Sequence, residues 1–206
     1  FDFLLLGMIK TVLATGNEHK AEEFEDLFAG SKFKVFSAAK FGGMPKVIEN
    51  GKTFQSNAYL KAFALSKQLK KKHWVIADDS GLEVDYLDGA PGIYSARYAG
   101  TKASDSDNLD KLLANLDGVS KSKRQARFRC VLCLIDKDAG TYYFEGTCEG
   151  SINLKPKGKT GFGYDPIFIP DGYKTSFAEL GESIKSQLSH RAKAVICCKK
   201  FFKKKF

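Results

Sequence analysis

The sequence predicts a mixed α/β domain in which a mixed sheet is flanked by helices. Apolar, β-branched runs alternate along the chain with amphipathic segments of helical period. The 206 residues are enough for one sizeable core, and 43% hydrophobic with 28% charged residues is typical of a globular protein. With no internal repeat or low-complexity linker, we expect one domain over residues 8–206, folded as two lobes around a cleft.

The N-terminal part is expected to begin with a strand, loop and helix. Residues 9–14 are β-branched and apolar, and a turn at 15–17 leads into a helix at 18–28. A second short strand is expected near 34–36, followed by a loop with glycines and a proline at 41–52. Such a unit leaves a strand end and a helix start next to each other in the fold.

The central part adds a helix and a buried strand. Residues 57–72 carry apolar side chains at helical spacing, and the apolar run 74–77 ends at Asp78. We therefore interpret Asp78-Asp79-Ser80-Gly81 as an acidic turn at the carboxyl end of a strand. Open α/β sheets place their ligands at that position.

The C-terminal half is expected to contain a β-hairpin and two helices. After a loop at 88–92, the pattern predicts a helix at 104–116, paired strands at 127–135 and 141–148, a further strand at 150–154, and a helix from about Ser189 into the tail.

The net charge of +9 is concentrated at the C-terminus. Five lysines lie in the last eight residues, which leaves +4 (9 − 5) for the rest of the chain. A moderately basic body favours a phosphate-bearing ligand of any size, from a nucleotide to a nucleic acid, because this attraction does not depend on sequence. Charge alone leaves both classes open.

The five cysteines do not have the paired short spacings of a zinc site. Cys130 and Cys133 fall in a predicted strand, where a separation of three points the side chains to opposite faces. We interpret them as small apolar core residues. Reduced thiols fit a reducing compartment, so we expect a cytoplasmic protein.

Residues 1–7 are apolar, but they are too few to span a bilayer and lack the basic flank of a signal peptide. A predicted strand follows Met8 directly. We therefore interpret residues 1–7 as an extension from upstream of the natural start, and we expect no membrane partner.

Three further segments carry candidate site residues. The first, Thr15-Gly16-Asn17-Glu18-His19-Lys20, joins a strand to a helix, so its amides and Lys20 could hold phosphate oxygens. A plain turn with an Asn cap is the alternative.

In the acidic turn, the adjacent carboxylates Asp78 and Asp79 repel each other, and a Mg²⁺ ion that also binds substrate phosphates would compensate them. Glu49 is the candidate second metal ligand, and a turn that merely caps the next segment is the alternative.

The second segment, Gly161-Phe162-Gly163-Tyr164-Asp165-Pro166, suits a flat heterocycle. Its glycines allow close approach, Phe162 and Tyr164 offer stacking faces, and Asp165 accepts hydrogen bonds from ring N–H groups. The alternative is a turn whose aromatics are buried in the core.

The third segment, Ser189-His190-Arg191, adds donors together with Lys185. A guanidinium only donates, so Arg191 favours an oxo group over a 6-amino purine. The alternative is a helix start with solvated basic residues.

Together these segments resemble the inosine/xanthosine triphosphate pyrophosphatase family, the Ham1 or RdgB-like group. The resemblance runs from Met8 to about Ala194 and depends on six ordered blocks: 14–17 with Lys20; Phe54, Asn57-Ala58 and Lys61-Ala62; 76–82; 89–98; 161–168; and 189–192.

The resemblance implies a homodimer that hydrolyses ITP, dITP, XTP and dXTP to the monophosphate and pyrophosphate, with Mg²⁺ as cofactor. It assigns the metal to Glu49 and Asp79, and water activation to Asp79. The triphosphate is assigned to residues 15–20 and Lys61. The nucleoside is assigned to Ser80, Phe162, Gly163, Tyr164, Asp165, Lys185, His190 and Arg191.

Two positions depart from the pattern of the family. His19 stands where many members have Gly, and Ser56 where many have an acidic residue. Two other functions remain as alternatives: a pyrophosphatase for other modified nucleotides, and a nucleic-acid-binding protein. We disfavour the latter because the excess positive charge lies at one end, while the motif residues are acidic and aromatic, and we expect no nucleic-acid partner.

Overall fold

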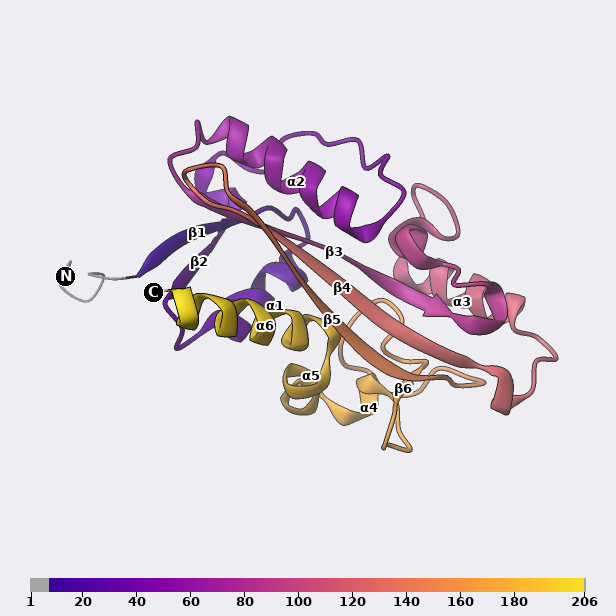
Figure 1. The fold of residues 1–206 in the computed structure, drawn as a ribbon. Helices are drawn as coiled ribbons and strands as arrows, with labels where there is room; N and C mark the ends of the chain where they lie inside the picture. The colour runs from indigo at the N-terminus through magenta and orange to yellow at the C-terminus, as the bar shows by residue number, and fades with distance from the viewer. Residues whose placement is uncertain (1–7, 206) are drawn as a thin grey trace. The chain divides into compact units, whose positions relative to one another are not determined.

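The computed structural model describes residues 8–205, and side chains for residues 8–203. The expected extension at 1–7 lies outside the described residues. A six-stranded mixed sheet of order β2-β1-β3-β4-β5-β6 is flanked by helices, so the predicted fold class is confirmed (Figure 1). The strands are β1 (Ile9–Leu13), β2 (Phe33–Ser37), β3 (Trp74–Val84), β4 (Gln125–Ile135), β5 (Thr141–Ile152) and β6 (Phe168–Pro170). The helices are α1 (Glu18–Phe28), α2 (Phe54–Gln68), α3 (Asp105–Asn115), α4 (Phe177–Leu180), α5 (Glu182–Leu188) and α6 (His190–Lys205).

The chain divides into two compact units. The first contains the residues up to Asp79, Val131–Glu145 and the residues from Ala194 onwards; the second contains Ser80–Cys130 and Gly146–Lys193. The boundaries fall inside β3, β4, β5 and α6, so each of these elements contributes to both units. This explains why no linker is visible in the sequence.

In the first unit, β1 pairs in parallel with both β2 and β3. One face of these strands packs against α2, and the shared core contains Val12, Ala58, Leu65, Val75 and Ala77. Alternate side chains point to opposite faces of a strand. Val75 and Ala77 therefore define the α2 face of β3.

The opposite face of the first unit is covered by α1 and the C-terminal part of α6 (Figure 1). An aromatic cluster lies there: the Phe202 ring contacts Phe33 at 5.1 Å and Trp74 at 5.4 Å between centroids, both edge-on. Phe202 is 1% exposed, so this ring belongs to the core of the first unit.

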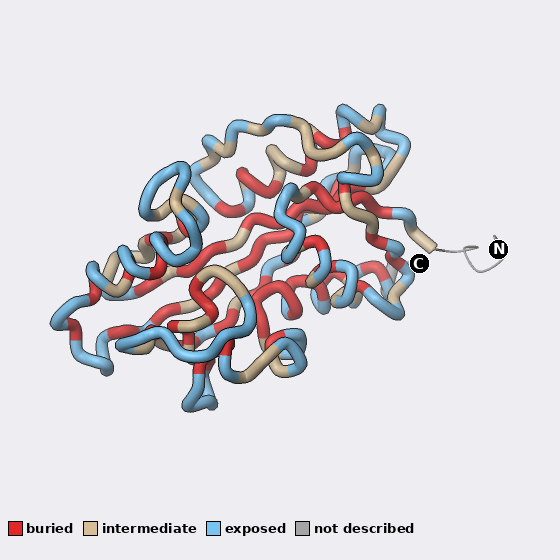
Figure 2. Tube along the Cα trace, turned by 180° about the vertical axis from the view of Figure 1, so that it is seen from behind, coloured by how far each residue is buried: buried red, intermediate tan, exposed pale blue. Residues whose placement is uncertain are grey.

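In the second unit, β6 pairs antiparallel with the end of β5. The core is formed by α3, the ends of the long strands and the segment before α4, and it includes Leu82, Leu112, Phe128, Phe168 and Phe177. α3 begins with a capping box between Ser104 and Asp107. Buried residues follow the strands in both units (Figure 2).

The cysteines behave as expected. Cys130 and Cys133 are fully buried in β4, and all five cysteines are free thiols. Burial raises the pKa of the Cys133 thiol to about 12, which keeps it protonated and unreactive. Within residues 8–205, no helix is both long and apolar enough to cross a membrane.

The helix predicted at 57–72 is displaced toward the N-terminus. α2 begins at Phe54 because Thr53 and Ser56 form a capping box. It ends at Gln68 because Lys70 and Lys71 adopt positive φ angles of 51° and 56°, which are incompatible with a right-handed helix.

The prediction of an acidic turn is wrong. Asp78, Asp79, Ser80 and Gly81 lie within β3, which continues to Val84. Their polar character resembles a turn, but two lysines compensate the carboxylates in place, and the buried Leu82 and Val84 continue the strand.

Candidate functional site

Asp78 and Asp79 are adjacent in a strand, so their side chains point to opposite faces of the sheet. Asp79 shares the α2 face with Val75 and Ala77, and its Oδ1 accepts a hydrogen bond of 2.8 Å from Lys61 Nζ. Asp78 lies on the α1 face, and its Oδ2 accepts one of 2.8 Å from Lys20 Nζ. Each carboxylate therefore has its own cation, which removes much of the predicted repulsion.

Lys61 lies between two carboxylates. Its Nζ also donates to Glu49 Oε2 at 3.1 Å, so the predicted metal ligands Glu49 and Asp79 bond the same ammonium. Lys61 is largely buried, and although burial lowers the lysine pKa, the charges of Asp78, Asp79 and Glu49 raise it overall. The site therefore already holds one positive charge between the two carboxylates.

Asp79 is a buried carboxylate with only one of its oxygens bonded to residues that the structure describes. It is 7% exposed, and burial raises its pKa against the lowering effect of Lys61. Its second oxygen, Oδ2, is buried and has no hydrogen-bond partner among the described residues. Leaving such an acceptor unmatched costs free energy, which makes Oδ2 a candidate to bind a further group.

The predicted Mg²⁺ would meet two carboxylates and a lysine at this site. Within the described part of the chain, there is no cluster of three or more His, Cys, Asp or Glu side chains suited to a metal. Mg²⁺ does not need one, because it commonly binds through one or two carboxylates and completes its shell with water and substrate phosphates. Glu49 and Asp79 supply the two carboxylates of that mode.

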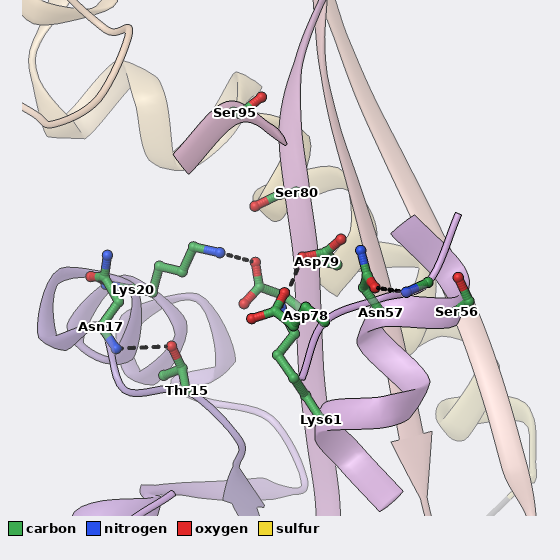
Figure 3. Close-up of polar contacts among 12 residues, drawn as sticks. Thr15, Asn17, Lys20, Ser56, Asn57, Lys61, Asp78, Asp79, Ser80 and Ser95 are labelled. Atoms are coloured by element: carbon green, nitrogen blue, oxygen red, sulfur yellow. Dashed lines mark hydrogen bonds and ion pairs between the residues drawn. The ribbon is translucent and has the colours of Figure 1, made fainter. Parts of the chain in front are cut away.

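The segment at 15–20 is a capped helix start. Asn17 is the N-cap of α1, and its Oδ1 accepts a hydrogen bond from Lys20 N at 3.0 Å, while Asn17 N donates to Thr15 Oγ1 at 3.1 Å (Figure 3). The Asn cap of the alternative interpretation is thus present. The first N–H groups of a helix nevertheless remain available to an anion, and Gly16, Glu18 and His19 are exposed beside them. The phosphate-binding role stays a prediction.

In the second unit, Asp165 stabilises the segment 161–166, which we call the aromatic loop. Its buried Oδ2 accepts hydrogen bonds of 2.9 Å from both Phe162 N and Lys185 Nζ. Burial raises the pKa of Asp165, and Lys185, at 3% exposure, opposes that shift. This carboxylate therefore has a structural task in the loop, and its predicted contact with the base is untested.

The expectation of two stacking faces is wrong for Tyr164. This ring is 5% exposed and packs in the core of the second unit, and its hydroxyl donates to Ser95 O at 2.9 Å. Phe162 remains half-buried, with Lys185 Nζ 4.5 Å and Arg191 Cζ 5.2 Å from its ring centroid. One aromatic face and two cations thus form the centre of this group.

The start of α6 completes the group. Arg191 Nη2 donates to Ser80 Oγ at 3.1 Å, which brings together two predicted nucleoside contacts from distant parts of the chain. His190 is 3% exposed and stacks on Phe128 at 4.8 Å between centroids, with 12° between the ring planes. The alternative of solvated basic residues is therefore wrong for both side chains.

Sequence reasoning did not assign a role to two residues that the structure connects to these groups. Asp105, the first residue of α3, accepts a hydrogen bond of 2.8 Å from Gly163 N and so anchors the aromatic loop. Asn57 is fully buried in α2, one helical turn before Lys61. An Asn among the mostly apolar residues that α2 buries is the signal that could have identified it.

The site residues thus form one set in each unit. The first contains carboxylates, lysines and a helix start, which together suit phosphates and a cation. The second contains one aromatic face with donors, which suits a planar polar ring. Asp79 belongs to the first set and Ser80 to the second, and the two residues are adjacent in the sequence of β3. The first set is of the kind that α/β proteins use to bind phosphate groups, and the second is of the kind that binds a planar ring.

Comparison with known proteins identifies the family. The profile of the Ham1 family matches residues 11–201, and the chain belongs to this family. It is 49% identical over 192 residues to a dITP/XTP pyrophosphatase of Opitutus terrae, covering 90% of this chain and 95% of that protein. Among solved structures, it is similar to the Ham1 protein of Staphylococcus aureus (TM-score 0.84, 40% identity) and a HAM1 protein of Coxiella burnetii (TM-score 0.85, 36% identity), with 96% of this chain and 100% of each structure covered.

Proposed function

We propose that this protein is a Mg²⁺-dependent nucleoside triphosphate pyrophosphatase that converts ITP, dITP, XTP and dXTP to the monophosphate and pyrophosphate. The observation that carries the proposal is the buried Asp79, with one oxygen on Lys61 and the other unmatched. The dITP/XTP pyrophosphatase of Opitutus terrae, at 49% identity, supports the choice of substrates.

The residues of the first unit would act on the triphosphate. Residues 15–20 offer N–H groups at the start of α1, and Lys20 and Lys61 bring positive charge that can offset the charge of phosphate oxygens. Asp79 would take the proton of a water that attacks the α-phosphorus, and the bond between the α-phosphorus and the bridging oxygen breaks to release pyrophosphate. Glu49 and Asp79 would hold Mg²⁺, which shields the phosphate charge.

The second unit would select the base. Phe162 offers a stacking face, and the guanidinium of Arg191 lies over that ring as a donor. A donor suits the 6-oxo group of hypoxanthine and xanthine, whereas the 6-amino group of adenine would place a donor against a donor. This arrangement supports the preference for ITP and XTP over ATP.

A nucleotide panel tests the proposal. The purified protein is incubated with dITP, XTP, dGTP and dATP, with Mg²⁺ or with a chelator, and pyrophosphate and phosphate are measured separately. We expect Mg²⁺-dependent release of pyrophosphate, much faster from dITP and XTP than from the other two. Release of phosphate alone would refute the reaction type. Equal rates on all four, or a preference for another modified nucleotide, would refute the base assignment.

Replacing Arg191 with Ala is expected to reduce the ratio of kcat/KM for dITP to that for dATP by about 10-fold, equivalent to ~1.4 kcal/mol. The reason is that the donor which separates an oxo from an amino group is lost. Arg127→Ala is the matched control, because this arginine is tied to Glu149 and Asp85 and has no place in the proposed site. An unchanged ratio in the Arg191 variant would show that another group reads the base.

The homodimer and the cytoplasmic location also stay predictions. Light scattering of the purified protein would decide the first, and fractionation of cells that produce it would decide the second.

A further inference from the structure

Asn57 is an uncommon residue for its position. It is 0% exposed on α2, and burying an amide costs free energy unless its polar atoms are hydrogen-bonded. Its Oδ1 accepts a hydrogen bond of 2.9 Å from Gly51 N. Its Nδ2 is buried and has no partner among the residues that the structure describes. The amide oxygen of Asn57 thus has a structural role, whereas the amide nitrogen has no such role among the described residues.

The Gly51 contact bears on the predicted metal ligand. Gly51 lies two residues after Glu49, so the bond to Asn57 Oδ1 ties this segment to α2. A Cβ at position 51 would come within 2.5 Å of Asn57 Oδ1, which explains why a glycine stands there. Asn57 therefore helps to place Glu49, but an acceptor alone would suffice for that.

The unmatched donor lies on the same side of α2 as the candidate catalytic residue. Residues four apart lie on one face of a helix, and Lys61, four residues after Asn57, reaches Asp79 Oδ1 at 2.8 Å. In the view of Figure 3, the amide nitrogen of Asn57 points toward the carboxylate of Asp79. Asp79 Oδ2 is itself buried and has no hydrogen-bond partner in the part of the chain that the structure describes. An unmatched donor and an unmatched acceptor therefore belong to one site.

We propose that Asn57 Nδ2 and Asp79 Oδ2 together hold the water that attacks the triphosphate; this inference rests on the proposed pyrophosphatase activity. The water oxygen accepts a hydrogen bond from Asn57, and one water O–H donates to Asp79. A buried water usually makes two to four such bonds.

The atoms balance in this step. The water oxygen forms the new bond to phosphorus, and its proton passes to Asp79 Oδ2. The bond from phosphorus to the bridging oxygen breaks, and its electron pair leaves with pyrophosphate. Asn57 keeps its protons throughout. It orients the nucleophile, and thus complements the carboxylate that deprotonates it.

Two variants separate this role from the anchoring of Gly51. Asn57→Asp keeps the shape and an acceptor for Gly51 N but replaces the donor with an oxygen. Asn57→Ala removes both the donor and the acceptor. If the amide orients the water, both variants lower kcat for dITP roughly 10²-fold or more. Loss of water orientation acts on kcat, whereas a weakened nucleotide contact or repulsion by the new charge acts on KM.

Gln68→Glu is the matched control. It makes the same amide-to-carboxylate change in the same helix, where the amide donates to Gly43 O, far along α2 from Asn57. We expect its kcat to equal that of the wild type. Thermal unfolding of all variants verifies that they are folded, and kcat is compared per folded molecule.

The results distinguish this inference from the proposed function. If the wild type releases no pyrophosphate from dITP, the proposed function fails. If the wild type is active and Asn57→Asp keeps kcat within about threefold of the wild-type value while Asn57→Ala does not, the amide serves only as an anchor and the water-orienting role is refuted. Full activity of both variants would also refute it.

Discussion

Replacing Asp79 with Asn is expected to lower kcat for pyrophosphate release by roughly 10²–10⁴-fold, the usual contribution of a positioned general base. The new amide has the same shape, and its oxygen can still accept the hydrogen bond from Lys61, so the protein should stay folded. The variant loses both the group that accepts the proton of the water and one of the two predicted Mg²⁺ ligands. Steady-state kinetics with dITP measure the loss of kcat, and circular dichroism verifies that the variant is folded.

Asp110→Asn is the control for this variant, because Asp110 is an exposed residue of α3 and the same substitution there removes one negative charge. We expect its kcat to be unchanged. If Asp79→Asn retained the activity of the wild type, Asp79 could not be the residue that activates the water, and the assignment would have to move to another carboxylate.

Replacing Lys185 with Met is expected to lower the free energy of unfolding by roughly 3–5 kcal/mol, because it leaves the buried carboxylate of Asp165 without its cation. Both side chains of this pair are at most 5% exposed. The bond from Phe162 N to Asp165 Oδ2 would lose its support, so base discrimination should also weaken. Urea unfolding, followed by fluorescence and circular dichroism, measures the loss.

The same variant has a pH signature. The pKa of Asp165 is already raised by burial, and removal of Lys185 takes away the largest effect that lowers it. A carboxyl with a raised folded-state pKa keeps its proton to a higher pH than in the unfolded chain. Its contribution therefore favours folding at low pH and is lost as the pH rises from the ordinary value through the raised one. We expect Lys185→Met to show a steeper loss of stability over that range than the wild type.

Lys155→Met is the control for the stability measurement, because Lys155 is exposed in the loop after β5. Its free energy of unfolding should change by less than about 0.5 kcal/mol. Equal stability of the Lys185 variant and this control would mean that Asp165 is buried as a neutral acid and needs no cation.

Local patterns predicted the fold where the signals along the chain agreed. The helix at 18–28 was predicted at its observed bounds because helical spacing and the Asn17 cap indicate the same start. The strand β3 was predicted to end too early, since Asp78-Asp79-Ser80-Gly81 is polar and resembles a turn. What keeps these residues in a strand is the pair of lysines, Lys20 and Lys61, which lie 58 and 18 residues away from their partners.

The candidate site was predicted in a similar way. The chemistry of Asp79, Lys61 and Arg191 could be inferred from residue types and from the resemblance to a family. Burial could not: Tyr164 carries an aromatic ring like Phe162, but its ring packs in the core and its hydroxyl is bonded to Ser95. From the sequence, Asn57 could be assigned to a motif of the family but not to a role. Its role depends on which atoms of its amide are hydrogen-bonded, and only the structure shows this.

The sequence by itself determined the mixed α/β class and the Ham1 family, and it predicted the residues that we propose for binding phosphate, metal and base. Only the tertiary structure decided how the acidic pair Asp78 and Asp79 is divided. Strand geometry sends one carboxylate to Lys20 of α1 and the other to Lys61 of α2, and it leaves Asp79 with an oxygen for further chemistry. The physical reason is that the charge state and hydrogen bonding of a buried group depend on neighbours that are distant in sequence.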